Sequence, residues 1–159
     1  MDQTLIDAFS EQVTMERQNQ AGYNSLAVAM ERAGWRGMAA WMRRSAKDEG
    51  MHSHKFLSFL KTRGVFPKLD ELEAPPTAEG VVASFSVALS LEKSTTEAID
   101  TLYFLADERE DPAACEFLHW FIREQRKSED EINDILNDLN HDRTAWTKID
   151  RELHKGGLK

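Results

Sequence analysis

Four long stretches of the sequence have helical periodicity, and no proline interrupts their interiors. They cover about residues 4–33, 37–62, 79–107 and 112–139, and a shorter fifth stretch covers 143–154. Along each stretch, apolar residues recur at spacings of three and four, as they do on the buried face of an α-helix. Pro112 follows Asp111, a pair typical of a helix start because the carboxylate caps the first turn. The pattern predicts an all-α protein.

The lengths of the connections predict the topology. The turns near residues 34–36 and 108–111 are short, so the helices on either side of each turn should pack as antiparallel hairpins. The connection over about residues 63–78 is long enough to run the length of the bundle. We therefore expect an antiparallel four-helix bundle at about 4–139, with one long crossover between its second and third helices. The short fifth helix follows it, and we expect the whole chain, 1–159, to form one domain.

The apolar seam of each long helix is interrupted near its middle by polar residues. The interruptions are Glu16 in the first helix, Glu49 and His52 in the second, Glu92 in the third and Gln125 in the fourth. Because the midpoints of antiparallel helices lie at one level of a bundle, these side chains should converge. The sequence therefore predicts one buried polar layer in an otherwise apolar core.

The expected layer contains three carboxylates, and no lysine or arginine lies on the four seams to neutralise them. An isolated buried carboxylate is costly, so the layer favours a divalent cation. Glu49 and His52 lie three residues apart on one helix face, as in the Glu-x-x-His pattern of di-iron carboxylate bundles. Oxygen and nitrogen ligands without thiolates suit iron or manganese, with zinc as a competitor. The alternative is a metal-free layer that only fixes the helix register.

Composition argues against several other classes of protein. The formal net charge of −8 argues against nucleic acid as a partner and favours cations. No apolar run approaches the roughly 18 residues of a membrane span, and the first residues lack the basic and apolar regions of a signal peptide. Cys115 is the only cysteine, which excludes an internal disulfide and a four-thiolate zinc site. We therefore expect a cytoplasmic protein without nucleic-acid or membrane partners.

Several short motifs lie along the predicted helices at spacings that are specific when taken together. They are Met15-Glu16-Arg17 with Tyr23 downstream, Asp48-Glu49-Gly50-Met51-His52, Glu92, Phe117-Leu118-His119-Trp120-Phe121 followed by Glu124-Gln125, and Ile149-Asp150-Arg151-Glu152-Leu153. Over nearly the whole chain these motifs resemble bacterial non-haem ferritins. The resemblance implies the ferritin-like fold, with its long crossover and short C-terminal helix.

The resemblance also implies an activity. The protein is expected to be a ferroxidase that oxidises two Fe(II) ions per subunit with dioxygen or hydrogen peroxide, and to store the iron as a ferric mineral. It would assemble as a homo-oligomeric hollow shell of twenty-four subunits. Tyr23 is expected to lie beside the di-iron site and to donate an electron or a hydrogen bond there. No haem is expected, because Gly50 stands where bacterioferritins have the haem methionine.

The polar layer acquires individual roles from the same resemblance. The residue that matches Glu16 binds the first iron, with His52 beside it. Glu49 is expected to bridge the two irons, and Glu92 is expected to bind the second. Gln125 completes the metal site through a hydrogen bond.

The resemblance implies a third iron site as well. Bacterial relatives build it from carboxylates on the second and fourth helices, and Asp48 and Glu124 match two of its ligands. The neighbouring positions are Arg126, Lys127 and Ser128, where acidic residues would be expected. We therefore expect any third site to be weak.

Two further regions of the sequence match parts of ferritins that have roles in the assembled shell. Asp111 and Glu116 lie at the start of the fourth long helix, a region that lines the threefold channels of ferritins, so they are candidates for iron uptake. The alternative is a solvated acidic helix start.

The fifth helix has an apolar stripe of Trp146, Ile149 and Leu153, and a helix of this length is marginal alone in water. We expect the stripe to pack against neighbouring subunits around a fourfold axis.

Two other functions stay open on the sequence. One is a di-iron or di-manganese oxidase that stores no mineral and works as a monomer or dimer. The other is a structural four-helix bundle that binds no metal. The mass of the assembly discriminates the first from a storage shell, and a metal-binding measurement discriminates the second.

Overall fold

The computed structural model describes residues 1–156, and its regular structure in that part of the chain is entirely helical. The elements are α1 (Gln3–Arg32), α2 (Arg36–Thr62), α3 (Val81–Glu108), α4 (Pro112–His141), a 3-10 turn (Arg143–Ala145) and α5 (Trp146–His154). The predicted all-α class is confirmed. No helix among residues 1–156 is both long and apolar enough to cross a membrane. Residues 157–159, the end of the predicted domain, lie outside the described part.

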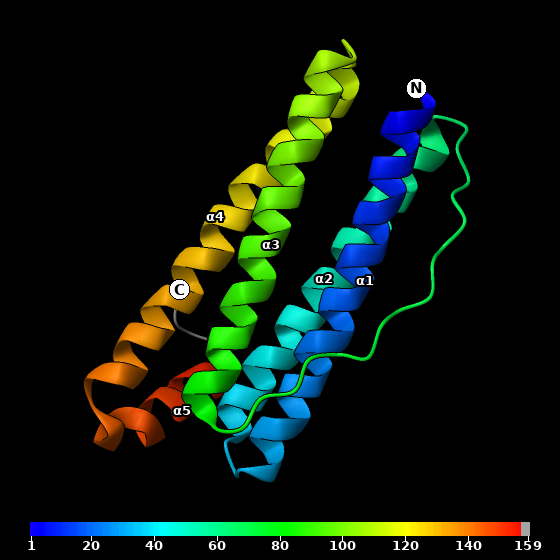
Figure 1. Ribbon diagram of the computed structural model, residues 1–159. Helices are drawn as coiled ribbons and strands as arrows, with labels where there is room; N and C mark the ends of the chain where they lie inside the picture. Colours follow the sequence, from blue (N-terminus) through cyan, green and yellow to red (C-terminus); the bar gives the residue numbers. More distant parts are fainter. Residues whose placement is uncertain (157–159) are drawn as a thin grey trace.

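Two antiparallel hairpins, α1 with α2 and α3 with α4, make up the bundle (Figure 1). Residues 65–80 form the crossover, which has no helix or strand and runs along α1. Hydrogen bonds hold it there: the Arg17 side chain donates to the carbonyl of Asp70, and Gln18 pairs with the backbone of Glu73 in both directions. The predicted topology, with its single long crossover, is confirmed.

Local sequence explains where the helices start. The Asp2 carboxylate caps α1 through the amide of Leu5, and Asp111 caps α4 as expected. The third helix, expected from about residue 79, begins at Val81. Gly80 has a φ of 89°, a left-handed conformation that a right-handed helix cannot include, so the chain turns there before it becomes helical.

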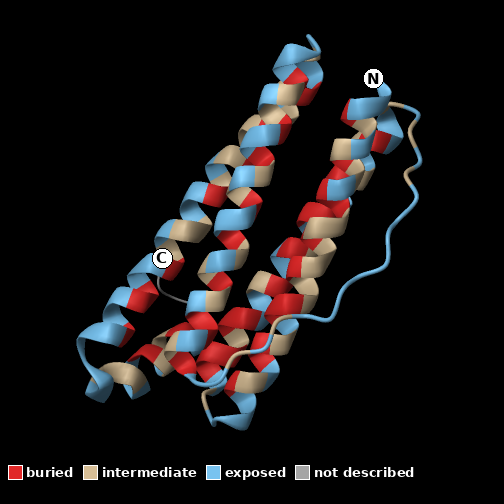
Figure 2. Cartoon of the chain, viewed as in Figure 1, coloured by how far each residue is buried: buried red, intermediate tan, exposed pale blue. Residues whose placement is uncertain are grey.

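The buried residues, red in Figure 2, lie along the long helices and α5. They form two apolar clusters with a polar layer between them. One cluster includes Phe9 and Phe56, and the other includes Met30 and Phe85. In every long helix the buried polar residue of the predicted layer lies between the members of the two clusters. The layer is therefore sealed by apolar packing toward both ends of the bundle.

The fifth helix packs differently from the expectation. Ile149 and Leu153 are buried in the apolar cluster of their own subunit, so this part of the stripe is not available to neighbouring subunits. The Asp150 carboxylate accepts a hydrogen bond of 2.8 Å from the amide of Met38, which is otherwise unpaired in the first turn of α2. Gly37 allows this approach, because a Cβ built on it would lie 1.6 Å from the Asp150 carbonyl oxygen.

We expect Gly37→Ala to detach α5 from α2. The methyl group cannot be accommodated by a flexible side chain, since the atom it meets belongs to the backbone, and overpacking of this kind costs about 1–3 kcal/mol. Hydrogen exchange of residues 146–154 should accelerate, and the melting temperature should fall by about 2–4 °C per kcal/mol. Arg36→Ala, at the exposed neighbouring position, is the control; equal exchange in both variants would contradict the close-packing argument.

Candidate metal centre

Four helices each contribute buried polar side chains to the middle of the bundle. Their heptad-like positions turn these residues inward: Glu16 from α1, Glu49 and His52 from α2, Glu92 from α3 and Gln125 from α4. None of the five is more than 6% exposed. The structure thus brings the whole predicted layer into the core, at the level where the two apolar clusters meet.

Glu16, Glu49 and His52 form the tightest group. One possible ligand atom from each lies within 4.8 Å of the other two. His52 Nδ1 is 3.6 Å from Glu16 Oε2 and 3.7 Å from Glu49 Oε1, which is too long for hydrogen bonds. Glu16 Oε2, Glu49 Oε2 and His52 Nδ1 are buried without a hydrogen-bond partner among residues 1–156. Buried polar atoms are normally paired, so three orphaned ligand atoms in one place fit a cation.

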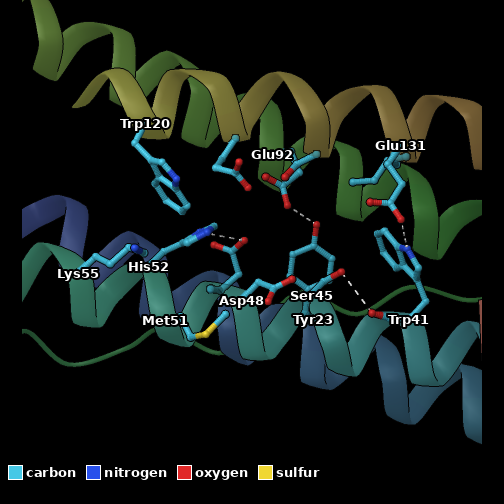
Figure 3. A pocket seen from close by; sticks show the side chains of 14 residues that line it. Tyr23, Trp41, Ser45, Asp48, Met51, His52, Lys55, Glu92, Trp120 and Glu131 are labelled. Atoms are coloured by element: carbon cyan, nitrogen blue, oxygen red, sulfur yellow. Dashed lines mark hydrogen bonds and ion pairs between the residues drawn. The ribbon is translucent and has the colours of Figure 1, made fainter. Parts of the chain in front are cut away.

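Glu92 is held by a different set of contacts. The Tyr23 hydroxyl donates to Glu92 Oε1 (Figure 3). The Gln125 amide donates to Glu92 Oε2 over 2.9 Å and to its carbonyl oxygen over 3.2 Å. Glu92 therefore lies beside the three-residue group but outside it, and its carboxylate is oriented by two neutral donors. Tyr23 occupies the position next to the centre that the resemblance implied.

Burial dominates the electrostatics of the carboxylates. It raises the pKa of Glu49 well above its ordinary value of 4.5, and the carboxylates of Glu16 and Glu92 raise it further. It also raises the pKa of Glu92, although the hydrogen bonds from Tyr23 and Gln125 oppose the rise. In the metal-free protein, burial therefore disfavours the ionised form of both carboxylates.

His52 supplies the positive charge that the layer otherwise lacks. Burial alone lowers the pKa of His52, but Glu16 and Glu49 raise it more strongly, from 6.5 to about 10. The imidazole is therefore protonated at neutral pH when no metal is bound. Imidazole binds metals in its neutral form, so an incoming cation must displace this proton. Metal affinity should consequently rise with pH.

A second layer of contacts, which the sequence patterns missed, orients Glu16. The Gln12 side chain, 3% exposed, donates from Nε2 to Glu16 Oε1 over 2.8 Å. This bond leaves Glu16 Oε2 as the oxygen that faces His52. The spacing of four residues on α1 is the sequence signal that could have identified the pair.

A cavity of about 220 Å³ reaches the centre between α2 and α4. Asp48, Glu124 and Ser128 line it, together with Glu49 and residues from the other helices. The structure thus places both carboxylates expected for a third site at this cavity. Glu124 already accepts a 2.6 Å bond from Lys127, one of the residues that replaces an expected acidic ligand.

The two channel candidates lie at the start of α4, away from the centre. Asp111 is paired with Arg63 at the end of α2, with 2.7 Å between Oδ2 and Nη2, and this ion pair lowers the pKa of Asp111. Glu116 is exposed, and its Oε2 lies 3.4 Å from His119 Nδ1. Asp111 therefore has a structural partner in its own subunit, whereas Glu116 faces solvent.

The buried titratable groups of the centre should make the metal-free protein less stable as the pH rises from about 5 to 8. Glu49, Glu92 and His52 all have raised pKa values, so the folded state retains protons that the unfolded state releases. Glu49→Gln should make the slope of unfolding free energy against pH less negative, by at most about 1.4 kcal/mol per pH unit. Urea unfolding of chelator-treated protein measures the slope.

Glu97→Gln, at an exposed position of α3, is the matched control for this experiment, since it removes a carboxyl group without touching the centre. Identical slopes in both variants would show that Glu49 titrates like a surface carboxylate.

Three comparisons place the chain among known proteins. A family model described as a ferritin-like domain matches residues 6–141. A bacterial non-heme ferritin of Bacteroides fragilis is 27% identical over 140 residues, 87% of this chain and 88% of the relative. One of Staphylococcus epidermidis is 26% identical over 157 residues, 96% of this chain and 95% of the relative. An open pore ferritin from Archaeoglobus fulgidus superposes with a TM-score of 0.93 at 28% identity, covering 100% of this chain and 99% of that one. The chain therefore belongs to the ferritin family.

Proposed function

We propose that this protein oxidises Fe(II) and stores the iron as a ferric mineral. The observation that carries the proposal is the convergence of three buried ligand groups with orphaned atoms, Glu16, Glu49 and His52. A further buried carboxylate, Glu92, lies beside them. Membership of the ferritin family and the non-heme ferritins among its relatives support the same function.

Two ferrous ions would bind as substrates in the polar layer. Glu16 and His52 would hold the first ion, and Glu92 the second. Glu49 lies in one group with Glu16 and His52 and lines the same cavity as Glu92, so its carboxylate would bridge the two ions. The hydrogen bonds from Tyr23 and Gln125 would orient Glu92 before iron arrives, because second-layer contacts of this kind fix the geometry of metal ligands.

The reaction needs little chemistry from the protein itself. Oxidation of two Fe(II) ions releases two electrons, which reduce dioxygen to hydrogen peroxide or hydrogen peroxide to water. The redox change belongs to iron, while the side chains bind, orient and desolvate the ions. The apolar clusters at both ends of the layer keep bulk water out, so iron and the oxidant would reach the centre through the cavity between α2 and α4.

We also propose that the protein forms a homo-oligomeric shell of twenty-four subunits in the cytoplasm. The structures it resembles are an open pore ferritin and an engineered closed form of that ferritin, and both descriptions fit a hollow assembly. A sedimentation mass near one or two subunits would instead support an oxidase that stores no mineral.

Two further pairs of carboxylates lie outside the di-iron centre. Asp48 and Glu124 would bind a third iron only transiently, because Lys127 competes for Glu124. At the start of α4, Glu116 is the more accessible channel carboxylate, since Asp111 is engaged by Arg63. The third iron site and the channel role of Glu116 would both operate only in the assembled shell.

Aerobic addition of two Fe(II) ions per subunit tests the main proposal. Ferric absorbance and dioxygen consumption should rise much faster than in buffer, and iron should co-sediment with the protein. Glu49→Gln should slow oxidation by more than roughly 10-fold, because the bridging ligand is lost, while the exposed Glu97→Gln should not. Oxidation at the buffer rate in the native protein would overturn the ferroxidase assignment.

Gln12→Met should weaken metal binding without removing a ligand. Glu16 would lose the donor that fixes its orientation, so affinity for Zn(II), a redox-inactive probe, should fall by roughly 10–100-fold. Isothermal titration calorimetry measures this change. Asn19→Leu is the matched control, since Asn19 is a buried amide on the same helix whose bond goes to Thr95. An equal effect in both variants would reduce Gln12 to a general packing residue.

A further inference from the structure

Trp41 on α2 links the surroundings of the centre to the cavity between α2 and α4. Its side chain is 5% exposed, and its indole Nε1 donates a 2.8 Å hydrogen bond to Glu131 Oε1 on α4 (Figure 3). On the other side its ring meets the ring of Tyr23 edge to face, with centroids 6.1 Å apart. Tyr23 in turn donates to Glu92, so the contacts run unbroken from a proposed iron ligand to Glu131.

The acceptor distinguishes Trp41 from the other tryptophans. A buried indole N–H needs a partner, and Trp146 finds an ordinary one in the carbonyl oxygen of Leu139. Among residues 1–156, Trp41 is the only tryptophan whose indole donates to a carboxylate. A carboxylate satisfies the bond as a carbonyl does, but it is also a Brønsted base that can accept the proton outright.

Indole and phenol rings are the protein side chains that most readily give up one electron, and an oxidised indole becomes strongly acidic at its N–H. Tyr23, Trp41 and Glu131 all line the cavity that reaches the centre. Glu131 is only partly buried there, so a proton that it accepts can pass on to water. Trp41 and Glu131 therefore combine an electron donor with an acceptor for its proton.

We propose that Trp41 is an auxiliary electron donor to the iron-oxidising centre, with Tyr23 as the conducting contact and Glu131 as the acceptor of the indole proton. The proposal rests on the proposed ferroxidase function. Reduction of hydrogen peroxide to two water molecules consumes two electrons and two protons. When two Fe(II) ions are bound, iron supplies both electrons.

When only one Fe(II) ion is bound, that ion gives one electron and Trp41 gives the other. Trp41 loses its Nε1 proton to Glu131 and becomes a neutral radical. Peroxide takes up two protons from the solution, and Glu131 returns the indole proton to it, so the step consumes one proton overall. Iron becomes Fe(III), the O–O bond breaks, and both oxygen atoms leave as water. Without the second electron, a lone ferrous ion would release a hydroxyl radical. Electron donation by Trp41 would therefore protect a subunit that holds one Fe(II) ion from hydroxyl radicals.

The experiment uses the assembled protein loaded anaerobically with one Fe(II) ion per subunit, then mixed with hydrogen peroxide and frozen rapidly. Electron paramagnetic resonance should detect a neutral tryptophan radical in the native protein. In Trp41→Phe this signal should be absent and a longer-lived tyrosyl signal should replace it. Trp35→Phe, which removes a tryptophan outside the cavity, should keep the native signal.

Glu131→Gln isolates the proton acceptor. Its amide oxygen can still accept the indole hydrogen bond but cannot take the proton, so the neutral-radical yield should fall by roughly 10-fold or more. Circular dichroism and sedimentation confirm that each variant folds and assembles, and peptide mass spectrometry of the native protein independently locates oxidised indole at Trp41.

The outcomes separate the two proposals. Iron oxidation in the native protein without an indole radical, or with the same radical in Trp41→Phe, overturns the role of Trp41 and leaves the ferroxidase intact. An unchanged neutral-radical yield in Glu131→Gln overturns the role of Glu131. If the native protein oxidises no iron in the same samples, both proposals fall.

Discussion

The burial of three carboxylates at the middle of an apolar bundle is the constraint on which the rest of the structure depends. Glu16, Glu49 and Glu92 lie where desolvation opposes their ionised form, and no lysine or arginine on the seams compensates them. A chain that tolerates this arrangement must either protonate the groups or bind cations there. Family membership and the orphaned ligand atoms both favour cations.

The carboxylates are stabilised unequally, and this inequality suits a site that takes up its metal. Glu92 is held in place by the neutral donors of Tyr23 and Gln125. Glu49 and the free Oε2 of Glu16 share the imidazolium of His52, at distances longer than hydrogen bonds, while Gln12 holds the other oxygen of Glu16. The contacts of Glu92 therefore fix that ligand before metal binds. Around His52, by contrast, ligand atoms stay unpaired, and the imidazole carries a proton that a cation can displace.

Much of this could be predicted from the sequence because the helices are long and regular. Spacings of three and four residues identified the inward faces, and loop lengths ordered the hairpins, so the level at which Glu49 and Glu92 meet followed without coordinates. The fifth helix shows where such reasoning fails. Its apolar stripe was visible, but periodicity does not say which surface the stripe covers, and Ile149 and Leu153 pack on their own bundle.

The sequence by itself therefore determined the helices, their antiparallel order and the residue types of the polar layer, since these follow from periodicity and connection lengths. Only the tertiary structure decided that Gln12 orients Glu16, that Trp41 donates to Glu131, and which ligand atoms stay unpaired. Those features depend on side-chain directions and on contacts between helices. Spacing along one helix predicts its buried face but not the partner that each atom meets.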